Sequence, residues 1–239
     1  MIIQLLGAIS LAEYVEAESA DGTAGVRKPD NCARCGARDC FWRHGRYQRT
    51  VIEGSQERKI SVTRLICKSC GLTVSLLQSF MVPYRQFSAA AISQAVEVYV
   101  DGTAGSYLEA ADSVSSKEED VQRPSSTQVF RWTDLLAWRA ERLLAESQKE
   151  IMLRGREGDL PENGTNSPNA VKAMTTLKRK RVNLLAELLS LGAVLVGEGD
   201  NLLCRLHHFF LFNAESMKEF LSGRKQRLPA PHNMQCVIF

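Results

Sequence analysis

The chain has 239 residues, of which 44% are hydrophobic and 24% charged, fractions typical of a globular protein and not of a disordered one. No apolar run reaches the ~20 residues that a membrane-spanning helix needs, so we do not expect an integral membrane protein. The net charge of +3 is unevenly distributed: residues 27–70 hold eleven Lys or Arg and only four acids, a net charge of +7. Such a segment attracts polyanions, most commonly nucleic acid, although a solvated basic face has the same composition.

Residues 1–30 are predicted to be an N-terminal segment that ends in a Gly-rich linker. The apolar residues 1–12 have no positive charge among them and acids directly after them. We therefore expect a short strand, helix or tail there rather than a signal peptide. Without export the seven cysteines lie in the reducing cytoplasm, where metal binding is favoured over disulfides.

Two copies of a C-x-x-C-G element stand in residues 31–82, the first at 32–36 and the second at 67–71. A two-residue gap lets both thiolates reach one tetrahedral Zn²⁺ at about 2.3 Å, and the glycine permits the positive φ that closes such a knuckle. The alternative of a redox site is less favoured, because a redox C-x-x-C needs only one cysteine pair and here there are two. Cys40 and His44 lie between the two pairs, and either could replace one of the four cysteines as a metal ligand. We predict one structural zinc ion, and its ligands are Cys32, Cys35, Cys67 and Cys70.

The residues between the cysteine pairs are predicted to form a hairpin, with strands over 42–52 and 58–66 and a turn at 53–57. Guanidinium groups bind phosphate in bidentate fashion, and strand spacing can line them along a DNA backbone. The residues predicted to do so are Arg43, Arg46, Arg49 and Arg64. Aromatic residues alternate with them and could instead cover the small core, as we expect of Trp42.

Three helices are predicted in residues 83–146. Ser88 is a good N-cap for a helix over 89–100, Ser106 for a short helix through 107–111, and Pro124-Ser125-Ser126 begins a long one. This order is typical of a helix-turn-helix, whose last helix presents its first turns to the major groove. The residues predicted to approach bases are Ser126, Thr127, Gln128 and Arg131. Three amphipathic helices that only pack or dimerise would have the same pattern.

The rest of the chain carries fewer signals. Residues 147–170 are predicted to be a linker because Gly, Pro and Asn gather there, and residues 171–239 are predicted to be helical. The basic run 178–181 stands at the head of a predicted apolar face, which consists of Leu177, Leu184, Leu185, Leu188, Leu189 and Leu191. The run is either a second contact to the DNA backbone beside a dimerising helix or, as we favour, a solvated charge run. His207 and His208 are adjacent and point to different faces of a helix, which makes them a poor metal pair.

Over residues 31–140 the chain resembles the zinc-ribbon and helix-turn-helix region of insertion-sequence transposases and of related bacterial transposase-like proteins of unassigned role. The motifs that carry the resemblance are the two C-x-x-C-G pairs, W-R-H-G-R-Y-x-R at 42–49, R-L-I-C-K-S-C-G-L-T at 64–73 and S-T-Q-V-F-R-W at 126–132. The resemblance implies double-stranded DNA as a partner, together with a homodimer or a separate transposase subunit. The chain departs from the family in two places. The segment 114–124 is longer and more acidic than the usual tight turn between the helices, and no carboxylate triad that could bind Mg²⁺ is recognisable after residue 145.

The sequence thus predicts an α+β protein with a small zinc-ribbon hairpin, helix-turn-helix-like helices and a helical C-terminal region. The expected function is that of a DNA-binding protein with structural zinc, similar to the recognition part of a transposase and without its catalytic domain. The alternatives are a zinc-stabilised protein–protein adaptor or transcriptional regulator, and a nuclease or transposase subunit whose carboxylates are not recognisable.

Overall fold

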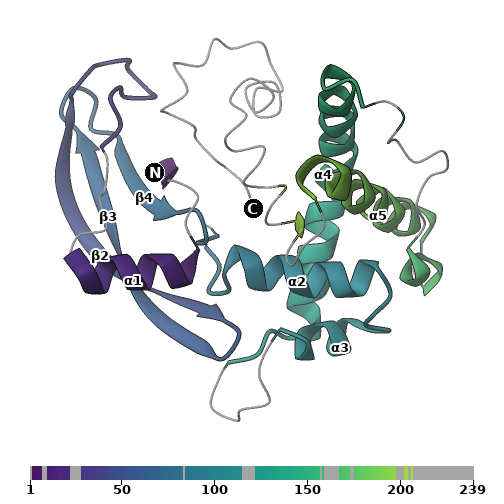
Figure 1. Ribbon diagram of the computed structural model, residues 1–239. Helices are drawn as coiled ribbons and strands as arrows, with labels where there is room; N and C mark the ends of the chain where they lie inside the picture. The colour runs from purple at the N-terminus through teal and green to yellow at the C-terminus, as the bar shows by residue number, and fades with distance from the viewer. Residues whose placement is uncertain are drawn as a thin grey trace. The chain divides into compact units, whose positions relative to one another are not determined.

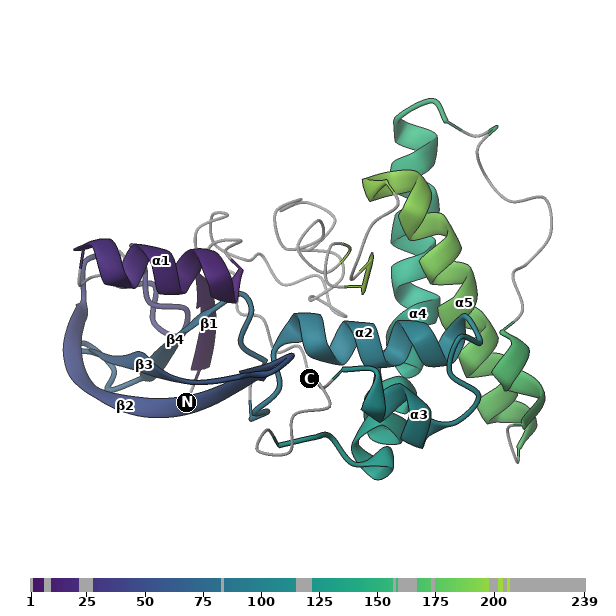
Figure 2. The ribbon, with the colours of Figure 1, turned by 60° about the horizontal axis from the view of Figure 1, so that its bottom comes forward.

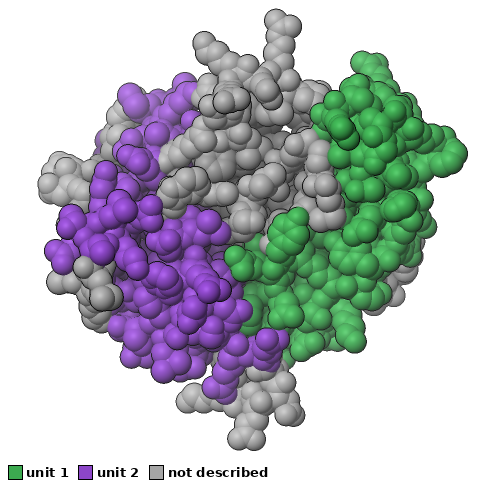
Figure 3. Space-filling model, turned by 180° about the vertical axis from the view of Figure 1, so that it is seen from behind, with its two compact units in different colours: residues 1–89, 221–239 green, residues 90–220 purple. Residues whose placement is uncertain are grey.

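The computed structural model describes residues 2–6, 10–21, 28–82, 84–114, 122–156, 158, 167–172, 175–197, 202, 203 and 206. The architecture is α+β, as predicted: a four-stranded sheet is followed along the chain by helices (Figure 1, and Figure 2 from a second side). The chain divides into two compact units, residues 1–89 with 221–239 and residues 90–220 (Figure 3). None of the described helices combines the length and the apolar composition needed to cross a membrane.

The sheet has the strand order β1-β4-β3-β2. The predicted hairpin is confirmed, since β2 (Phe41–Glu53) and β3 (Gln56–Cys67) pair antiparallel around a turn at residues 54–55. β4 (Thr73–Gln78) adds antiparallel to β3, and β1 (Ile2–Leu6) adds parallel to β4. The hairpin therefore belongs to a larger sheet than the sequence predicted.

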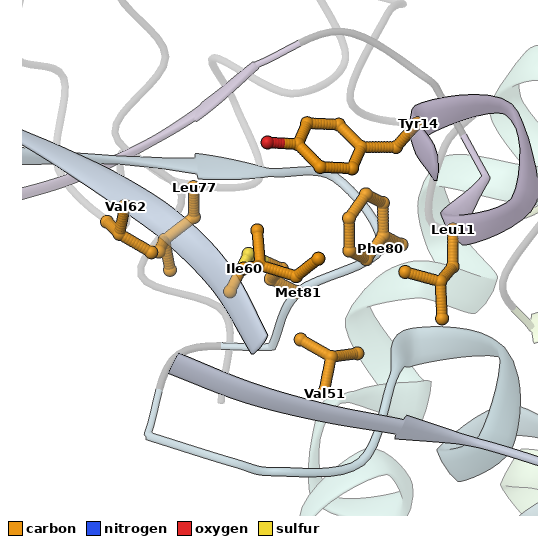
Figure 4. Packing of buried hydrophobic residues seen from close by; sticks show 8 residues of the cluster. All are labelled: Leu11, Tyr14, Val51, Ile60, Val62, Leu77, Phe80 and Met81. Carbon is orange, nitrogen blue, oxygen red and sulfur yellow. The ribbon is translucent and has the colours of Figure 1, made fainter. Parts of the chain in front are cut away.

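One face of this sheet is covered by α1 (Leu11–Asp21), as Figures 1 and 2 show. Ser10 and Glu13 exchange hydrogen bonds at the helix start, in the manner of a capping box. The ring centroids of Tyr14 and Phe80 lie 5.5 Å apart. Apolar side chains from the helix, from three strands and from the segment after β4 form one cluster (Figure 4): Leu11, Tyr14, Val51, Ile60, Val62, Leu77, Phe80 and Met81.

The opposite face of the sheet, toward the end of β3, packs against the first cysteine knuckle. Leu65 on β3 pairs with Val74 on β4, so both side chains point to this face. They form a second cluster with residues of the knuckles: Cys32, Cys40, Phe41, Leu65, Cys67, Val74 and Leu76. The cysteine knuckles are thus part of the hydrophobic core of the first unit.

The helices of the second unit follow the predicted order. α2 (Ala89–Val100) and α3 (Tyr107–Asp112) lie where the sequence predicted them, and the Ser106 side chain accepts a hydrogen bond from the backbone N–H of Glu109 as the N-cap of α3. α4 (Ser126–Leu153) begins at the predicted residue but continues beyond residue 146, with Ile151 fully buried near its end.

The segment predicted to be a linker at 147–170 contains buried polar residues that bind α2. Asn169 Nδ2 donates to the carbonyl oxygens of Tyr99 and Ala104, both at 2.7 Å, and Ser167 Oγ donates to Val100 O at 2.6 Å. These bonds satisfy carbonyl groups at and after the C-terminal end of α2, which have no partner within the helix. The short helix η2 (Pro168–Lys172) is thereby fixed to the helical unit.

The last described helix is α5 (Thr176–Val196), which lies beside α4 in Figures 1 and 2. Leu185, Leu188 and Leu191 of the predicted apolar face are buried, whereas Leu177 is 58% exposed and does not belong to it. His207 and His208 lie outside the described residues.

Candidate metal centre

Both C-x-x-C-G elements fold into the same knuckle. Gly36 N donates to Cys32 O at 2.8 Å, and Gly71 N donates to Cys67 O at 2.9 Å. The two glycines have φ values of 72° and 70°, a left-handed conformation that costs a side-chain-bearing residue free energy. Glycine after the second cysteine therefore allows each turn to close and aim its two thiols at one point.

The two knuckles bring four sulfur atoms together, those of Cys32, Cys35, Cys67 and Cys70, which all lie within 4.8 Å of one another. The Sγ atoms of Cys32 and Cys70 are 3.6 Å apart, and those of Cys35 and Cys67 are 3.8 Å apart. A tetrahedral zinc site with Zn–S bonds of about 2.3 Å spaces its sulfurs by about 3.8 Å, whereas a disulfide needs about 2.05 Å. The group can hold a metal ion, and none of its four cysteines is joined in a disulfide.

The surrounding backbone fixes the two knuckles against each other. Cys67 ends β3, so the second knuckle continues directly from the sheet. The backbone N–H of Lys68 donates to Cys40 O at 2.9 Å, which joins the second knuckle to the residue before β2. In the first knuckle Asn31 and Arg38 form an isolated bridge that closes the loop. The sulfur positions are therefore set by hydrogen bonds from both sides.

Cys40 is a fifth thiol beside this tetrad. Its Sγ lies 3.3 Å from Cys67 Sγ and 3.2 Å from Ala37 O. Cys40 donates to Ala37 O, and burial, together with the neighbouring thiols, raises the pKa of Cys40 to about 12. The other predicted alternative ligand, His44, is exposed on β2 and is not part of the cluster.

The thiols of the tetrad differ in how easily they ionise. Burial opposes ionisation of Cys67, but hydrogen bonds from the Cys40 thiol and from the backbone N–H groups of Cys70 and Ser69 lower its pKa to about 6. Cys70 accepts a hydrogen bond from Leu72 N–H, yet burial and the adjacent thiols raise its pKa to about 12. Thiolates are the form that binds metal, so a cation entering the site releases protons.

The four arginines of the predicted DNA surface lie on two faces of the hairpin. Arg43 and Arg46 pair with Leu65 and Thr63, which are two residues apart and so share a face, and both arginines are exposed. Arg49 pairs with Ile60 on the opposite face.

Arg49 and Arg64 are half-buried on the face that α1 covers. The guanidinium of Arg49 donates to Val82 O and, at 2.6 Å, to Arg85 O, and burial lowers its pKa. That of Arg64 lies 5.2 Å from the centroid of the Tyr47 ring. Arg49 and Arg64 thus contact other parts of the chain, whereas Arg43 and Arg46 are exposed.

Trp42 is 57% exposed, so the expectation that it covers the core of the ribbon was wrong. The ammonium of Lys68 lies 3.0 Å from the centroid of its ring, and a cation over an indole face is a favourable contact. The sequence analysis missed Lys68, although its place inside the second knuckle, beside a ligand, was a signal. An aromatic ring and a cation are thus exposed next to the sulfur tetrad.

The start of α4 presents three of the four residues predicted to approach bases. Ser126, Thr127 and Arg131 are exposed. Gln128 instead completes a capping box: its Oε1 accepts from Ser125 N at 2.7 Å, and its own N–H donates to Ser125 Oγ at 3.2 Å. The Gln128 side chain therefore stabilises the helix end.

Comparison with known proteins connects part of the chain to a family. A family model described as a domain of unknown function, DUF6431, matches residues 32–117. The matched region contains the whole sulfur tetrad and the four hairpin arginines, and it ends before the start of α4. No curated protein and no solved structure matches the chain.

Proposed function

We propose that this chain is a cytoplasmic DNA-binding protein, in which one structural zinc ion holds Cys32, Cys35, Cys67 and Cys70 together. In this proposal it acts like the DNA-recognition part of a transposase and carries no catalytic centre. The single observation that carries the proposal is the sulfur tetrad, whose spacing matches tetrahedral thiolate coordination and which lies at one end of a basic hairpin.

The choice of zinc follows from the donor set. Four thiolates in two knuckles are typical of structural zinc sites, which are closed and leave no position for a reactive water molecule. Because Cys32 and Cys67 belong to the hydrophobic cluster beside the first knuckle, loss of the ion would disturb that core as well. The ion therefore stabilises the fold and does not perform chemistry.

The choice of DNA rests on charge and exposure. Of the ten Lys and Arg residues that the structure describes within 28–70, eight are exposed, and only Arg49 and Arg64 are half-buried. Arg43 and Arg46 lie on the same face, where guanidinium groups can reach successive phosphates of one strand. In the second unit Ser126, Thr127 and Arg131 extend from the first turns of a helix, as in a recognition helix.

Salt-dependent binding of duplex DNA tests this proposal. We expect the zinc-loaded full chain to lose affinity steeply as salt rises from ~50 to ~200 mM, because phosphate contacts release counterions. The slope of log K against log [salt] is negative, and the double variant Arg43→Ala/Arg46→Ala should make it less steep by ~1.8, or ~0.9 for each lost contact. The matched control is Lys28→Ala/Arg38→Ala, which removes two exposed charges outside the strands and should change the slope less.

Two results would count against the proposal. An affinity that does not change with salt would favour the adaptor function, in which zinc only stabilises a protein-binding fold. Purified protein that is fully folded with less than one zinc per chain would remove the structural role of the ion.

A further inference from the structure

The starts of α4 and α5 lie side by side, because the two helices run in the same direction. The ammonium of Lys178, near the start of α5, lies 4.5 Å from the centroid of the Phe130 ring near the start of α4. One turn further along, Arg181 NH1 lies 3.2 Å from Asp134 Oδ1. Past the far end of α4, Arg156 NH1 donates to Val194 O on α5 at 2.9 Å. The basic run 178–181 is therefore next to the exposed residues predicted to approach bases.

The four basic residues of this run have two different roles. Lys178 and Arg181 are half-buried and contact α4, so they fix the position of α5 along its neighbour. Arg179 and Lys180 are exposed. The sequence has no acid between residues 175 and 186, so α5 itself places no negative charge near them. Between residues 175 and 186 the chain thus carries four basic residues and no acid.

The spacing of packed helices decides what these exposed charges can reach. Neighbouring helices lie about 8–10 Å apart, whereas the major groove of DNA is about 12 Å wide and admits a single helix. If α4 enters the groove by its first turns, α5 cannot enter beside it. The start of α5 must then lie over the sugar-phosphate backbone that borders the groove.

We infer that the start of α5 is a second DNA-contact surface, on which Arg179 and Lys180 bind backbone phosphates beside the groove that α4 reads. Lys178 and Arg181 are positioning residues that hold the two helices in register. This inference rests on the proposed function and adds to it a binding surface outside the basic hairpin. Because phosphates carry no base identity, this surface contributes affinity and orientation and no sequence preference.

The test uses the zinc-loaded full chain and duplex DNA of several unrelated sequences. We expect Arg179→Gln/Lys180→Gln to make the negative slope of log K against log [salt] less steep by ~1.8. The same variant should weaken binding equally for all sequences. The control Lys149→Gln/Arg154→Gln removes the same charge from two exposed residues near the other end of the helix pair and should leave the slope unchanged. The exchange Arg179→Lys/Lys180→Arg keeps the charge and should keep the slope.

Each other outcome has one meaning. If the parent chain shows steep salt dependence and Arg179→Gln/Lys180→Gln leaves it unchanged, the inference is wrong and the proposed function stands. If both Gln double variants make the slope less steep by the same amount, only net charge matters and the start of α5 is not a contact surface. If the parent chain does not bind duplex DNA at all, the proposed function fails and this inference fails with it.

Discussion

Cys40 lies against the sulfur tetrad without belonging to it, and this arrangement makes a sharp test of the ligand set. Cys35 is exposed, so replacing it removes one ligand without deleting a buried side chain. We expect Cys35→Ser to lower the bound zinc from one to well below one per chain, as measured by elemental analysis after dialysis. Cys40→Ala should keep one zinc, because four thiolates remain. Loss of zinc in Cys40→Ala and retention in Cys35→Ser would show that the ligand set is wrong.

Arg46 and Arg49 are three residues apart on β2 and offer a second matched pair. The Arg49 guanidinium donates to two carbonyl oxygens, so Arg49→Ala leaves them without this donor and should lower the free energy of unfolding by about 1–3 kcal/mol. Arg46 is exposed, and Arg46→Ala should change the stability by less than about 0.5 kcal/mol. Urea denaturation of the zinc-loaded chain measures both values, and equal losses would contradict the assignment.

At the level of residues, the sequence predicted local features well and non-local contacts poorly. The C-x-x-C-G spacing was enough to predict the knuckles, because the thiols and the glycine that each turn needs are adjacent in the chain. Trp42 was assigned to the core because aromatic residues usually lie there, whereas its partner Lys68 stands 26 positions away in the sequence. No local pattern encodes that contact.

Two adjacent serines at the start of α4 have different expected roles: Ser125 caps the helix, and Ser126 is a candidate DNA-binding residue. Ser125 caps the helix, so Ser125→Ala should lower the free energy of unfolding by about 1 kcal/mol. Its neighbour Ser126 is exposed, and Ser126→Ala should change stability by less than about 0.5 kcal/mol. Thermal melting followed by the helical circular-dichroism signal compares the two variants. A larger loss in Ser126→Ala would mean that the cap is misassigned.

At the level of elements, helices with strong end signals were predicted accurately, and buried elements were missed. Ser106 and Ser125 mark the helix starts that the structure confirms. β4 escaped prediction because Val74, Ser75, Leu76 and Leu77 are all buried, so the strand lacks the alternation that marks a half-exposed one. The bonds of Asn169 to Tyr99 and Ala104 leave no sequence signature either, which is why a loop rich in Gly and Pro was taken for a linker.

At the level of the whole molecule, the metal centre belongs to one of two compact units, and this predicts a selective response to metal removal. A chelator should increase amide hydrogen exchange throughout residues 31–82, because the knuckles and the adjacent cluster lose their cross-link. Amides of α4 and α5 should keep their protection, since the helices of the second unit hold no ligand from the tetrad. Mass spectrometry of peptides from the full chain measures both regions together.

The outcome that would contradict this expectation is equal loss of protection in both regions. Re-addition of zinc provides the control, because it should restore protection in residues 31–82 alone. The two-unit organisation was only partly visible in the sequence, which indicated where cysteines and helices gather but contained no signal that residues 167–170 fold back onto α2.

The position of β1 has a consequence for any shortened version of this protein. β1 pairs with β4 from Ile2 with Val74 to Leu6 with Gln78, and so occupies hydrogen-bonding groups on the outer side of that strand. A chain that began at the first knuckle would retain all four sulfurs yet leave a row of backbone donors and acceptors open. Such an open edge is a template for association with a second chain. In the structure this side of β4 is covered by residues 2–6, so the hydrogen bonding of β4 is completed by a segment that lies outside every motif that suggested a function.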